Sequence, residues 1–514
     1  TITDNDSAVV SVAATRDGAE TGPVDGRFTV SLSLAASTDT LINYNLGGTA
    51  TSGSDFAALP GQVTILAGDT TATIDVPAID DALVEGTETV SLTLTGIASG
   101  DADITLGSTS SAAIDLVDND AAAWTLTGDA AVGEGASAGY RLSLSGSFQS
   151  GEQAEVDLAL TDLETSSADY GNFAAAVTAA VASYAGPGSY GWDGTTLLWT
   201  ASADGQTPAD LTITLPALED ALVEADERYR VALANAGSPT GAAVTLGANR
   251  EVTTTITDND SAVVSVAATR DGNETGPVDG RFTVSLSLAA STDTLVSYAP
   301  GGTATSGSDF AALPGQVTIL AGDRAATISL PAIDDALVEG TETVSLTLRG
   351  IASGDGDITL GATTSATIDL VDNDTAAWTL SGDAAVGEGA SAGYRLSLSG
   401  SFQSGEQAEV DLALTDLETS SADYGNFAAA VTAAVASYAG PGSYGWDGTT
   451  LLWTASADGQ TPADLTITLP VLDDALVEAD ERYRVALANA GSPTGAGVTL
   501  GANREVTTTI TDND

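Results

Sequence analysis

Four residue types are missing from this chain: its 514 residues include no cysteine, histidine, lysine or methionine. Without cysteine or histidine there is no thiol nucleophile, no Ser-His-Asp triad and no zinc site of the usual kind. Without lysine there is neither a P-loop lysine nor a Schiff base. The lack of cysteine also fits an exported protein that does not rely on disulfides. Several common classes of enzyme are thereby excluded.

Positive charge is scarce as well. The 14 basic residues, all of them arginine, stand against 71 acidic ones, and the net charge is −57. A charge of this size repels phosphate backbones and anionic membrane surfaces. No apolar run reaches the roughly 18 residues of a membrane helix; the longest is the Ala-rich stretch 173–186. We therefore expect no nucleic-acid partner and no membrane insertion by this segment.

What the chain does contain is repetition. Residues 1–254 and 255–508 align without a gap and differ at only 19 positions. Within each copy the triplet Asp-Asn-Asp closes two diverged units of different length. The expected organisation is the last strand and exit loop of a preceding repeat (1–6), repeat one (7–120), repeat two (121–260), repeat three (261–374) and repeat four (375–514). Repeats two and four carry insertions at 170–196 and 424–450. The chain thus reads as a segment of a longer array.

Strict alternation of apolar and polar residues indicates an all-β fold. In RFTVSLSL, Phe28, Val30, Leu32 and Leu34 share one face. Similar runs begin at Val90 and Tyr140, and Gly, Pro and Asp turns separate them. About seven short strands in each shorter unit predict tandem antiparallel β-sandwiches.

Each insertion predicts a short helix followed by a hairpin that turns at Asp193-Gly194. Tyr190 and Trp192 fall on one face of that hairpin. Aromatic residues so placed either bind a sugar or cover the helix as a small core, and we favour the second interpretation. For Trp192, Trp199, Trp446 and Trp453 we expect packing against the helix of their own repeat.

A cluster of acids points to calcium. Asp80, Asp81, Glu85 and Glu88 lie within nine residues of one loop, and uncompensated carboxylates this close repel one another. Calcium takes six to eight oxygen ligands and resolves that repulsion. The alternative is that these acids are solvated turn residues. Identical acid spacing in two units whose other side chains differ favours calcium.

The combination of GTATSGSDF, IDDALVEGTETVSLTL and a terminal DND resembles the Calx-beta domain, which is found in sodium–calcium exchangers and in many bacterial surface and adhesion proteins. The resemblance implies immunoglobulin-like sandwiches with several calcium ions at one end, near the junction with the next domain. Three departures are visible: Asn at the centre of DND, Glu219 in place of Asp, and ETSS in place of GTAT in repeats two and four.

The metal ligands that follow, with leucine acting through its carbonyl, are Glu20, Asp55, Asp80, Asp81, Leu83, Glu85, Glu88, Asp118 and Asp120 in repeat one; Glu134, Asp169, Glu219, Asp220, Leu222, Glu224, Glu227, Asp258 and Asp260 in repeat two; Glu274, Asp309, Asp334, Asp335, Leu337, Glu339, Glu342, Asp372 and Asp374 in repeat three; and Glu388, Asp423, Asp473, Asp474, Leu476, Glu478, Glu481, Asp512 and Asp514 in repeat four.

The function expected is a calcium-binding structural array, not an enzyme: a calcium-stiffened rod within a large bacterial surface protein, adhesin stalk or extracellular fibre. Its partners would be neighbouring repeats of the same chain and, through filament formation or lateral assembly, other copies. The alternative is a carbohydrate-binding or adhesive module that uses the aromatic insertions. A hydrolase with paired carboxylates is the least favoured class, because the acids cluster as cation ligands do.

Overall fold

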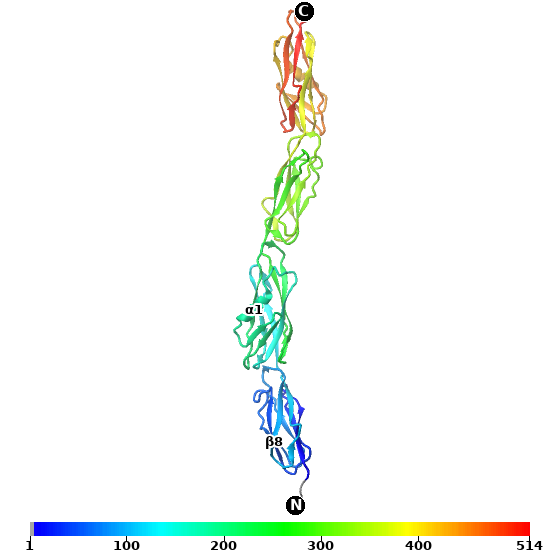
Figure 1. The fold of residues 1–514 in the computed structure, drawn as a ribbon. Coiled ribbons are helices and arrows are strands. Elements are labelled where there is room, and N and C mark those ends of the chain that lie inside the picture. The colour runs from blue at the N-terminus through cyan, green and yellow to red at the C-terminus, as the bar shows by residue number, and fades with distance from the viewer. Residues whose placement is uncertain (1–4) are drawn as a thin grey trace. The chain divides into compact units, whose positions relative to one another are not determined.

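The computed structural model describes residues 5–514, and they form an almost entirely β structure, as predicted (Figure 1). Most of the expected segment 1–6 lies outside these residues. By their contacts the described residues divide into two units. One unit runs to Asp220 and adds Ala225–Asn259; the other comprises Ala221–Glu224 and Asp260–Asp514.

In the first unit, the strands of repeat one are β1 (Ala8–Arg16), β2 (Gly18–Ala19), β3 (Gly26–Leu32), β4 (Thr40–Gly48), β5 (Gln62–Ile65), β6 (Thr71–Val76), β7 (Leu83–Val84), β8 (Glu88–Ser99), β9 (Ile104–Leu106) and β10 (Ser111–Val117). Repeat two contains β11 (Ala121–Gly128), β12 (Ala131–Gly133), β13 (Ser137–Leu144), β14 (Ser147–Phe148), β15 (Gln153–Asp162), α1 (Phe173–Ser183), β16 (Ser189–Trp192), β17 (Thr196–Thr200), β18 (Leu211–Pro216), β19 (Leu222–Val223), β20 (Glu227–Gly237), β21 (Ala243–Leu246) and β22 (Glu251–Thr257), of which β19 belongs to the second unit.

In the second unit, repeat three contains β23 (Ala262–Arg270), β24 (Gly272–Asn273), β25 (Gly280–Leu286), β26 (Ala289–Ala290), β27 (Thr294–Gly302), β28 (Gln316–Ile319), β29 (Ala325–Leu330), β30 (Leu337–Val338), β31 (Glu342–Ser353), β32 (Ile358–Leu360) and β33 (Ser365–Val371). Repeat four contains β34 (Thr375–Gly382), β35 (Ala385–Gly387), β36 (Ser391–Leu398), β37 (Ser401–Phe402), β38 (Gln407–Asp416), α2 (Phe427–Ser437), β39 (Ser443–Trp446), β40 (Thr450–Thr454), β41 (Leu465–Pro470), β42 (Glu481–Gly491), β43 (Gly497–Leu500) and β44 (Glu505–Thr511).

Each repeat is a sandwich of two sheets. In repeat one the strand orders are β6-β3-β1-β9 and β2-β10-β8-β4-β5, and repeat three has the same arrangement. In repeats two and four the hairpin of the insertion extends the second sheet, which becomes β12-β22-β20-β15-β17-β16 in repeat two. The insertion therefore adds an edge strand and leaves the sandwich intact.

The alternating residues of the strands build the core. Phe28, Val30 and Leu32 on β3 are buried, and the residues between them are half-buried. The expected continuation of this face to Leu34 is wrong, because β3 ends at Leu32 and the Leu34 side chain is 52% exposed. The runs that begin at Val90 and Tyr140 are buried as predicted.

The predicted helix and hairpin of the insertion are confirmed. Asn172 caps α1 by accepting a hydrogen bond from the Ala175 amide at 2.8 Å, and Val177 of the helix joins the core of repeat two. Trp199 is fully buried: its ring lies 5.0 Å from that of Phe148, and its Nε1 donates to the Pro187 carbonyl. Tyr190 stacks edge-on against Tyr184, at 4.7 Å between ring centroids.

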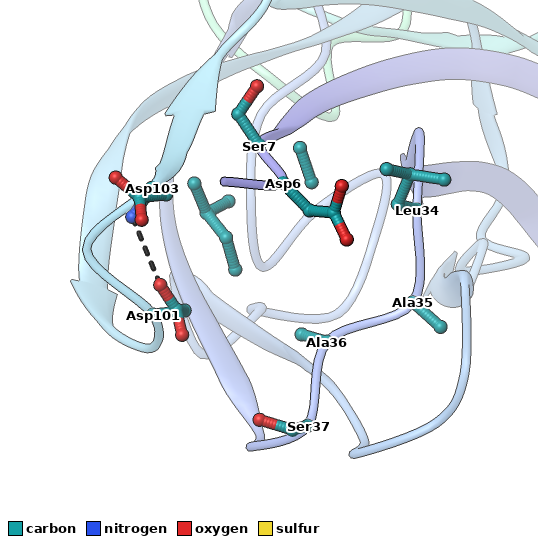
Figure 2. Close-up of a pocket in the computed structure, with 10 residues that line it drawn as sticks. Asp6, Ser7, Leu34, Ala35, Ala36, Ser37, Asp101 and Asp103 are labelled. Carbon is teal, nitrogen blue, oxygen red and sulfur yellow. Dashed lines mark hydrogen bonds between the residues drawn. The ribbon is translucent and has the colours of Figure 1, made fainter. Parts of the chain in front are cut away.

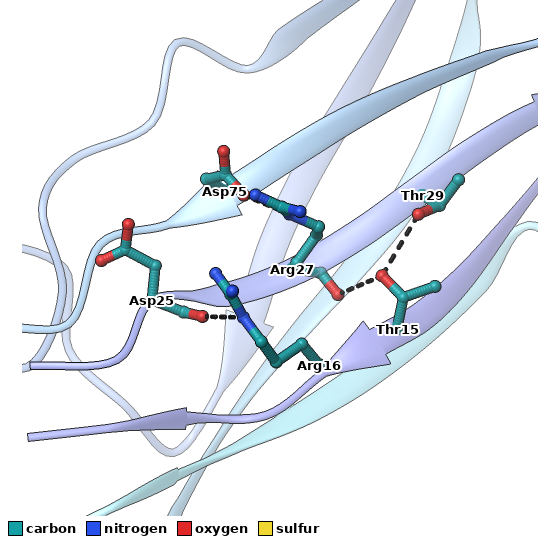
Figure 3. A network of polar contacts seen from close by, with 6 residues as sticks. All are labelled: Thr15, Arg16, Asp25, Arg27, Thr29 and Asp75. Carbon is teal, nitrogen blue, oxygen red and sulfur yellow. Dashed lines mark hydrogen bonds and ion pairs between the residues drawn. The ribbon is translucent and has the colours of Figure 1, made fainter.

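Polar residues cover the outer face of the first sheet. In repeat one Arg27 pairs with Asp75, Arg16 donates to the Asp25 carbonyl, and Thr15 donates to the Arg27 carbonyl (Figure 3). Both partners of the Arg27 pair are well exposed, so such a pair contributes at most about 1 kcal/mol. The two helices in residues 5–514 have 11 residues each, and no helix in that range is long and apolar enough to cross a membrane.

Candidate metal centre

The acids of repeat one converge because four chain segments end at the same edge of the sandwich. Strand β2 runs parallel to β10, and the Glu20 amide donates to the Val117 carbonyl at 3.0 Å. This pairing places Glu20 beside Asp118, the first residue after β10. Asp55 is tied to the same edge, since its carbonyl accepts the Ile79 amide at 3.0 Å.

The DND triplet organises this edge. The two carboxylate oxygens of Asp118 accept the amides of Glu85 and Asp120, each at 2.8 Å. Asn119 Nδ2 donates to Asp80 Oδ1 at 3.0 Å. The equivalent asparagines bond in the same way: Asn259 to Glu219, Asn373 to Asp334 and Asn513 to Asp473. The central asparagine therefore fixes the first acid of the loop, and Glu219 is held like its Asp counterparts.

Two groups of three carboxylates form within this edge. In each of the triads Glu20–Asp118–Asp120 and Asp55–Glu85–Glu88, one oxygen per residue lies within 4.8 Å of the others. Several of these oxygens are buried and have no hydrogen-bond partner in the protein: Glu20 Oε2, Asp55 Oδ1, Glu85 Oε1, Glu88 Oε2 and Asp120 Oδ2. An unpaired buried carboxylate oxygen is costly, so this arrangement needs a cation or protons.

Burial and mutual repulsion raise the pKa values of the glutamates. Burial and then the charges of Asp118, Asp81 and Asp120 raise the pKa of Glu20 to about 8. For Glu85, burial and then the charge of Asp55 raise the pKa to about 8. The pKa of Glu88 also rises to about 8 through burial and its hydrogen bond with Asp55.

Repeat three reproduces the centre. Burial is the main cause that raises the pKa of Glu274 and Glu342 to about 8 and that of Glu339 to about 9. The amides of Glu339 and Asp374 bond to the Asp372 carboxylate at 2.7 and 2.8 Å. Buried oxygens without a hydrogen-bond partner again face the cluster: Glu274 Oε2, Asp309 Oδ1, Glu339 Oε1, Glu342 Oε2 and Asp374 Oδ2.

Repeat two contacts the acidic centre of repeat one directly. Strand β7, in the acidic loop, pairs in parallel with β14 of repeat two, and Val84 is buried in the core of repeat two. The Gly86 amide donates to Glu152 Oε1 at 3.2 Å, and the charge of Glu152 contributes to the raised pKa of Glu88. Repeat four contacts the centre of repeat three in the same way: the Gly340 amide donates to Glu406 Oε1 at 3.2 Å. Glu152 and Glu406 are thus acids of the centre that come from the next repeat.

The predicted acids of repeats two and four are less buried than those of repeats one and three. In repeat four the Glu478 amide bonds to Asp512 at 2.9 Å, and the Leu476 amide bonds to Asp474 at 2.8 Å, as in repeats one and three. Its acids are exposed or half-buried, whereas Glu85 and Glu339 are each only 4% exposed. In repeat two, the Glu134 amide donates to Thr257 O, and the Leu218 amide donates to Asp169 O.

The sequence-based assignment and the structure agree in part and differ in two respects. Most of the predicted acids of repeats one and three converge. The leucine carbonyls remain predicted ligands; the structure shows the Leu83 and Leu337 amides donating to Asp81 and Asp335. Glu152 and Glu406 were missed because no spacing links them to the acidic loop, and Asn119 was counted only as a lost charge. Its recurrence in every DND triplet was the available signal.

The Calx-beta domain family matches residues 4–120, 203–260, 263–374 and 458–514, which together make up more than half of the chain. The chain belongs to the Calx-beta family. None of the curated protein sequences compared with this Calx-beta array matches it. Each matched segment ends at a DND triplet, so the family pattern and the acidic edge coincide.

Solved structures similar to this Calx-beta array include CBD12 from CALX1.2, with 14% identity and a TM-score of 0.20 over 48% of this chain and 99% of that one. The calcium binding domain CBD12 of CALX1.1 has 14% identity and a TM-score of 0.20, over 47% and 98% of the two chains. The apo-form Calx CBD1 domain has 18% identity and a TM-score of 0.19, over 27% and 98%.

Proposed function

We propose that the chain is a calcium-binding array in which each acidic cluster helps to fix one repeat to the next. One observation carries this proposal: buried carboxylate oxygens without hydrogen-bond partners gather at the edge where the next repeat docks. Membership of the Calx-beta family supports the same proposal, since Calx-beta domains of homologous proteins bind calcium.

The chemistry of the donors favours calcium over transition metals. The cluster offers only carboxylate and carbonyl oxygens, and the chain has no histidine or cysteine to supply nitrogen or sulfur ligands. The eight acids predicted as ligands in repeat one provide more oxygens than the six to eight that calcium takes. Ligands from separated loops also suit the flexible geometry of calcium better than the strict octahedron of magnesium.

The consequence for the array is mechanical. When carboxylates repel one another, the loop that carries β7 and the adjoining Glu152 are pushed apart. Bound calcium removes this repulsion, so the junction between repeats stiffens in calcium and loosens in chelator.

We place this array outside the cell, as a stalk or fibre segment of a bacterial surface protein. The adhesive alternative needs exposed aromatic residues on the insertion, whereas Trp199 and Trp453 are fully buried and Trp192 and Trp446 are half-buried.

Calorimetric titration of calcium tests the proposal. The double variant Glu85→Gln/Glu88→Gln keeps the size of both side chains and removes two carboxylates of repeat one, so we expect fewer calcium ions to bind. The exposed acid Asp69 lies outside the cluster, and Asp69→Asn should leave the titration unchanged. Equal calcium stoichiometry and affinity in the double variant and the native chain would refute the proposal.

A further inference from the structure

One glutamate reaches the acidic centre of repeat one from outside that repeat. Glu152 lies in the loop between β14 and β15 of repeat two and is 9% exposed. Its Oε1 accepts the Gly86 amide at 3.2 Å, and its Oε2 accepts the Thr240 hydroxyl. Its negative charge also acts on Glu88, in the acidic loop of repeat one. Glu152 therefore belongs to repeat two in sequence and to the centre of repeat one in its contacts.

The hydrogen bonds of Glu152 orient its carboxylate and still leave it able to bind a cation. A carboxylate has about four lone-pair sites, and the bonds from Gly86 and Thr240 occupy two of them. Thr240 is itself fixed, because the Gln153 amide donates to its hydroxyl oxygen at 3.2 Å. The remaining lone pairs of Glu152 are thus available on a side chain whose position is already set.

The triad beside Glu152 has buried oxygens that lack partners. Asp55 and Glu85 are each 4% exposed, and Asp55 Oδ1 and Glu85 Oε1 have no hydrogen-bond partner among residues 5–514. Together with Glu88, these side chains bring one oxygen each to within 4.8 Å of one another. Carboxylates this close repel one another unless a cation lies between them. The place that needs a cation therefore lies next to a carboxylate of the following repeat.

Repeats three and four carry the same arrangement. Glu406 Oε1 accepts the Gly340 amide at 3.2 Å, and its Oε2 accepts the Thr494 hydroxyl. The Gln407 amide donates to the Thr494 hydroxyl oxygen at 3.1 Å, and the charge of Glu406 acts on Glu342. Both junctions thus use one glycine, one glutamate and one threonine.

The glycine and the glutamate do not recur in the residues that join repeat two to repeat three. Ala225 stands in the acidic loop of repeat two where Gly86 stands in that of repeat one. Between β26 and β27 of repeat three the chain reads Ser-Thr-Asp, without a glutamate. The aspartate of this loop, Asp293, accepts the Ala321 amide at 2.8 Å. Its carboxylate is therefore already used within repeat three.

The loop that carries Thr240 differs in the same way. In repeat two it reads Ser-Pro-Thr-Gly-Ala between β20 and β21. The corresponding loop of repeat one, between β8 and β9, has two aspartates and no threonine, and the Asp103 amide donates to Asp101 at 3.1 Å (Figure 2). Repeat three has the same pair at Asp355 and Asp357. Within this sequence, the glycine, glutamate and threonine occur together only where repeat two or four follows.

We propose that calcium at the triad of repeat one is bound by two repeats at once, with Glu152 of repeat two completing the site. Glu406 completes the site of repeat three in the same way. This inference rests on the proposed function, because it requires that the centres bind calcium. Binding and docking are then linked: the factor by which docking raises calcium affinity equals the factor by which calcium strengthens docking. Repeats one and two form one calcium-locked pair, and repeats three and four form another.

Calorimetric titration of calcium into the full chain tests the shared site. Glu152→Gln combined with Glu406→Gln removes one charge from each pair and keeps an acceptor for the glycine amides. We expect calcium to bind about tenfold more weakly, or less tightly still, at two centres, as for lost support of a metal site. Glu155→Gln combined with Glu409→Gln makes the same change of charge three residues further on, in β15 and β38, and should leave the titration unchanged.

Hydrogen exchange at the amides of β7 and β14 distinguishes calcium binding from a merely structural role. In calcium, the variant with Glu152→Gln and Glu406→Gln should exchange these amides faster than the native chain. In chelator it should exchange them no faster, because a repelling charge is gone while the bond from Gly86 remains. Faster exchange in both buffers would mean that Glu152 only holds the loop, and the shared site would be wrong.

The outcomes keep this inference apart from the proposed function. If the native chain binds calcium and the variant with both glutamines binds it equally well, the shared site is overturned and the proposed function stands. If the native chain binds no calcium, both fail. Weaker binding in the control variant as well would show that Glu152 acts only through the total charge, which also contradicts the shared site.

Discussion

Asn119 shows how one amide can organise a cluster of acids. Its side chain donates to Asp80, so the first acid of the loop is oriented before any ion binds. An aspartate at this position would add a ligand charge but would lose the donor and repel Asp80. The asparagine thus stabilises the calcium-free centre at the expense of one negative charge.

Asn119→Asp should therefore destabilise repeat one in chelator by about 1.5–3 kcal/mol, the range for a lost hydrogen bond to a charged group. In saturating calcium the loss should shrink, because the cation binds the added carboxylate. Thermal unfolding in both buffers measures this difference. The exposed Asn45 is the control: Asn45→Asp should behave alike with and without calcium.

The raised pKa values of the buried glutamates predict how the calcium-free protein responds to pH. Glu20, Glu85 and Glu88 have folded pKa values of about 8, above the usual value for glutamate. At any pH between the usual glutamate pKa and about 8, the folded state therefore binds more protons than the unfolded state. Their contribution to the free energy of unfolding is full below the usual glutamate pKa and is lost as the pH rises to about 8.

Denaturant unfolding in chelator should accordingly show higher stability at mildly acidic pH than at pH of about 8. Calcium should reverse this trend, because it competes with protons for the same oxygens. A calcium-free protein whose stability increases across that pH interval would contradict the assignment of these protons.

At the scale of elements, the strands were predictable and the docking segments were not. Alternation over four or more residues located β3, β8 and β13, because a period of two is a local property. Strand β7 has two residues, and its partner β14 lies in the next repeat. No local pattern reveals such a pair, and Glu152 was missed for the same reason.

At Gly86 the acidic loop of repeat one lies against the backbone of repeat two. A Cβ atom at this position would lie 2.3 Å from the Thr240 carbonyl oxygen, a backbone atom that cannot move aside cheaply. Gly86→Ala should loosen the junction at a cost of about 1–3 kcal/mol. Faster hydrogen exchange at the amides of β7 and β14 would report the loosening. Gly96→Ala, where a Cβ meets nothing within 4 Å, should leave those amides unchanged.

At the scale of the whole molecule, a side chain of one repeat completes the core of another. Val84 belongs to repeat one in sequence but to the core of repeat two in packing. Val84→Ala should therefore lower the stability of repeat two by about 1–3 kcal/mol. Exchange rates of the buried β13 amides measure this effect. Val477→Ala removes the same methyl groups from an exposed site and should have no such effect on repeat four.

The sequence boundary of a repeat and the boundary of its packing therefore do not coincide. Cutting the chain after a DND triplet separates the short strand that carries the buried valine from the following repeat on which it docks, so an excised repeat exposes that valine. Copying the 254-residue pair as a block has the opposite effect. Each new block begins with a repeat whose Ala-Ala segment pairs with the Leu-Val strand at the end of the block before it, as Ala289-Ala290 pairs with Leu222-Val223. Such a gene can lengthen by duplication alone, with no new interface to evolve.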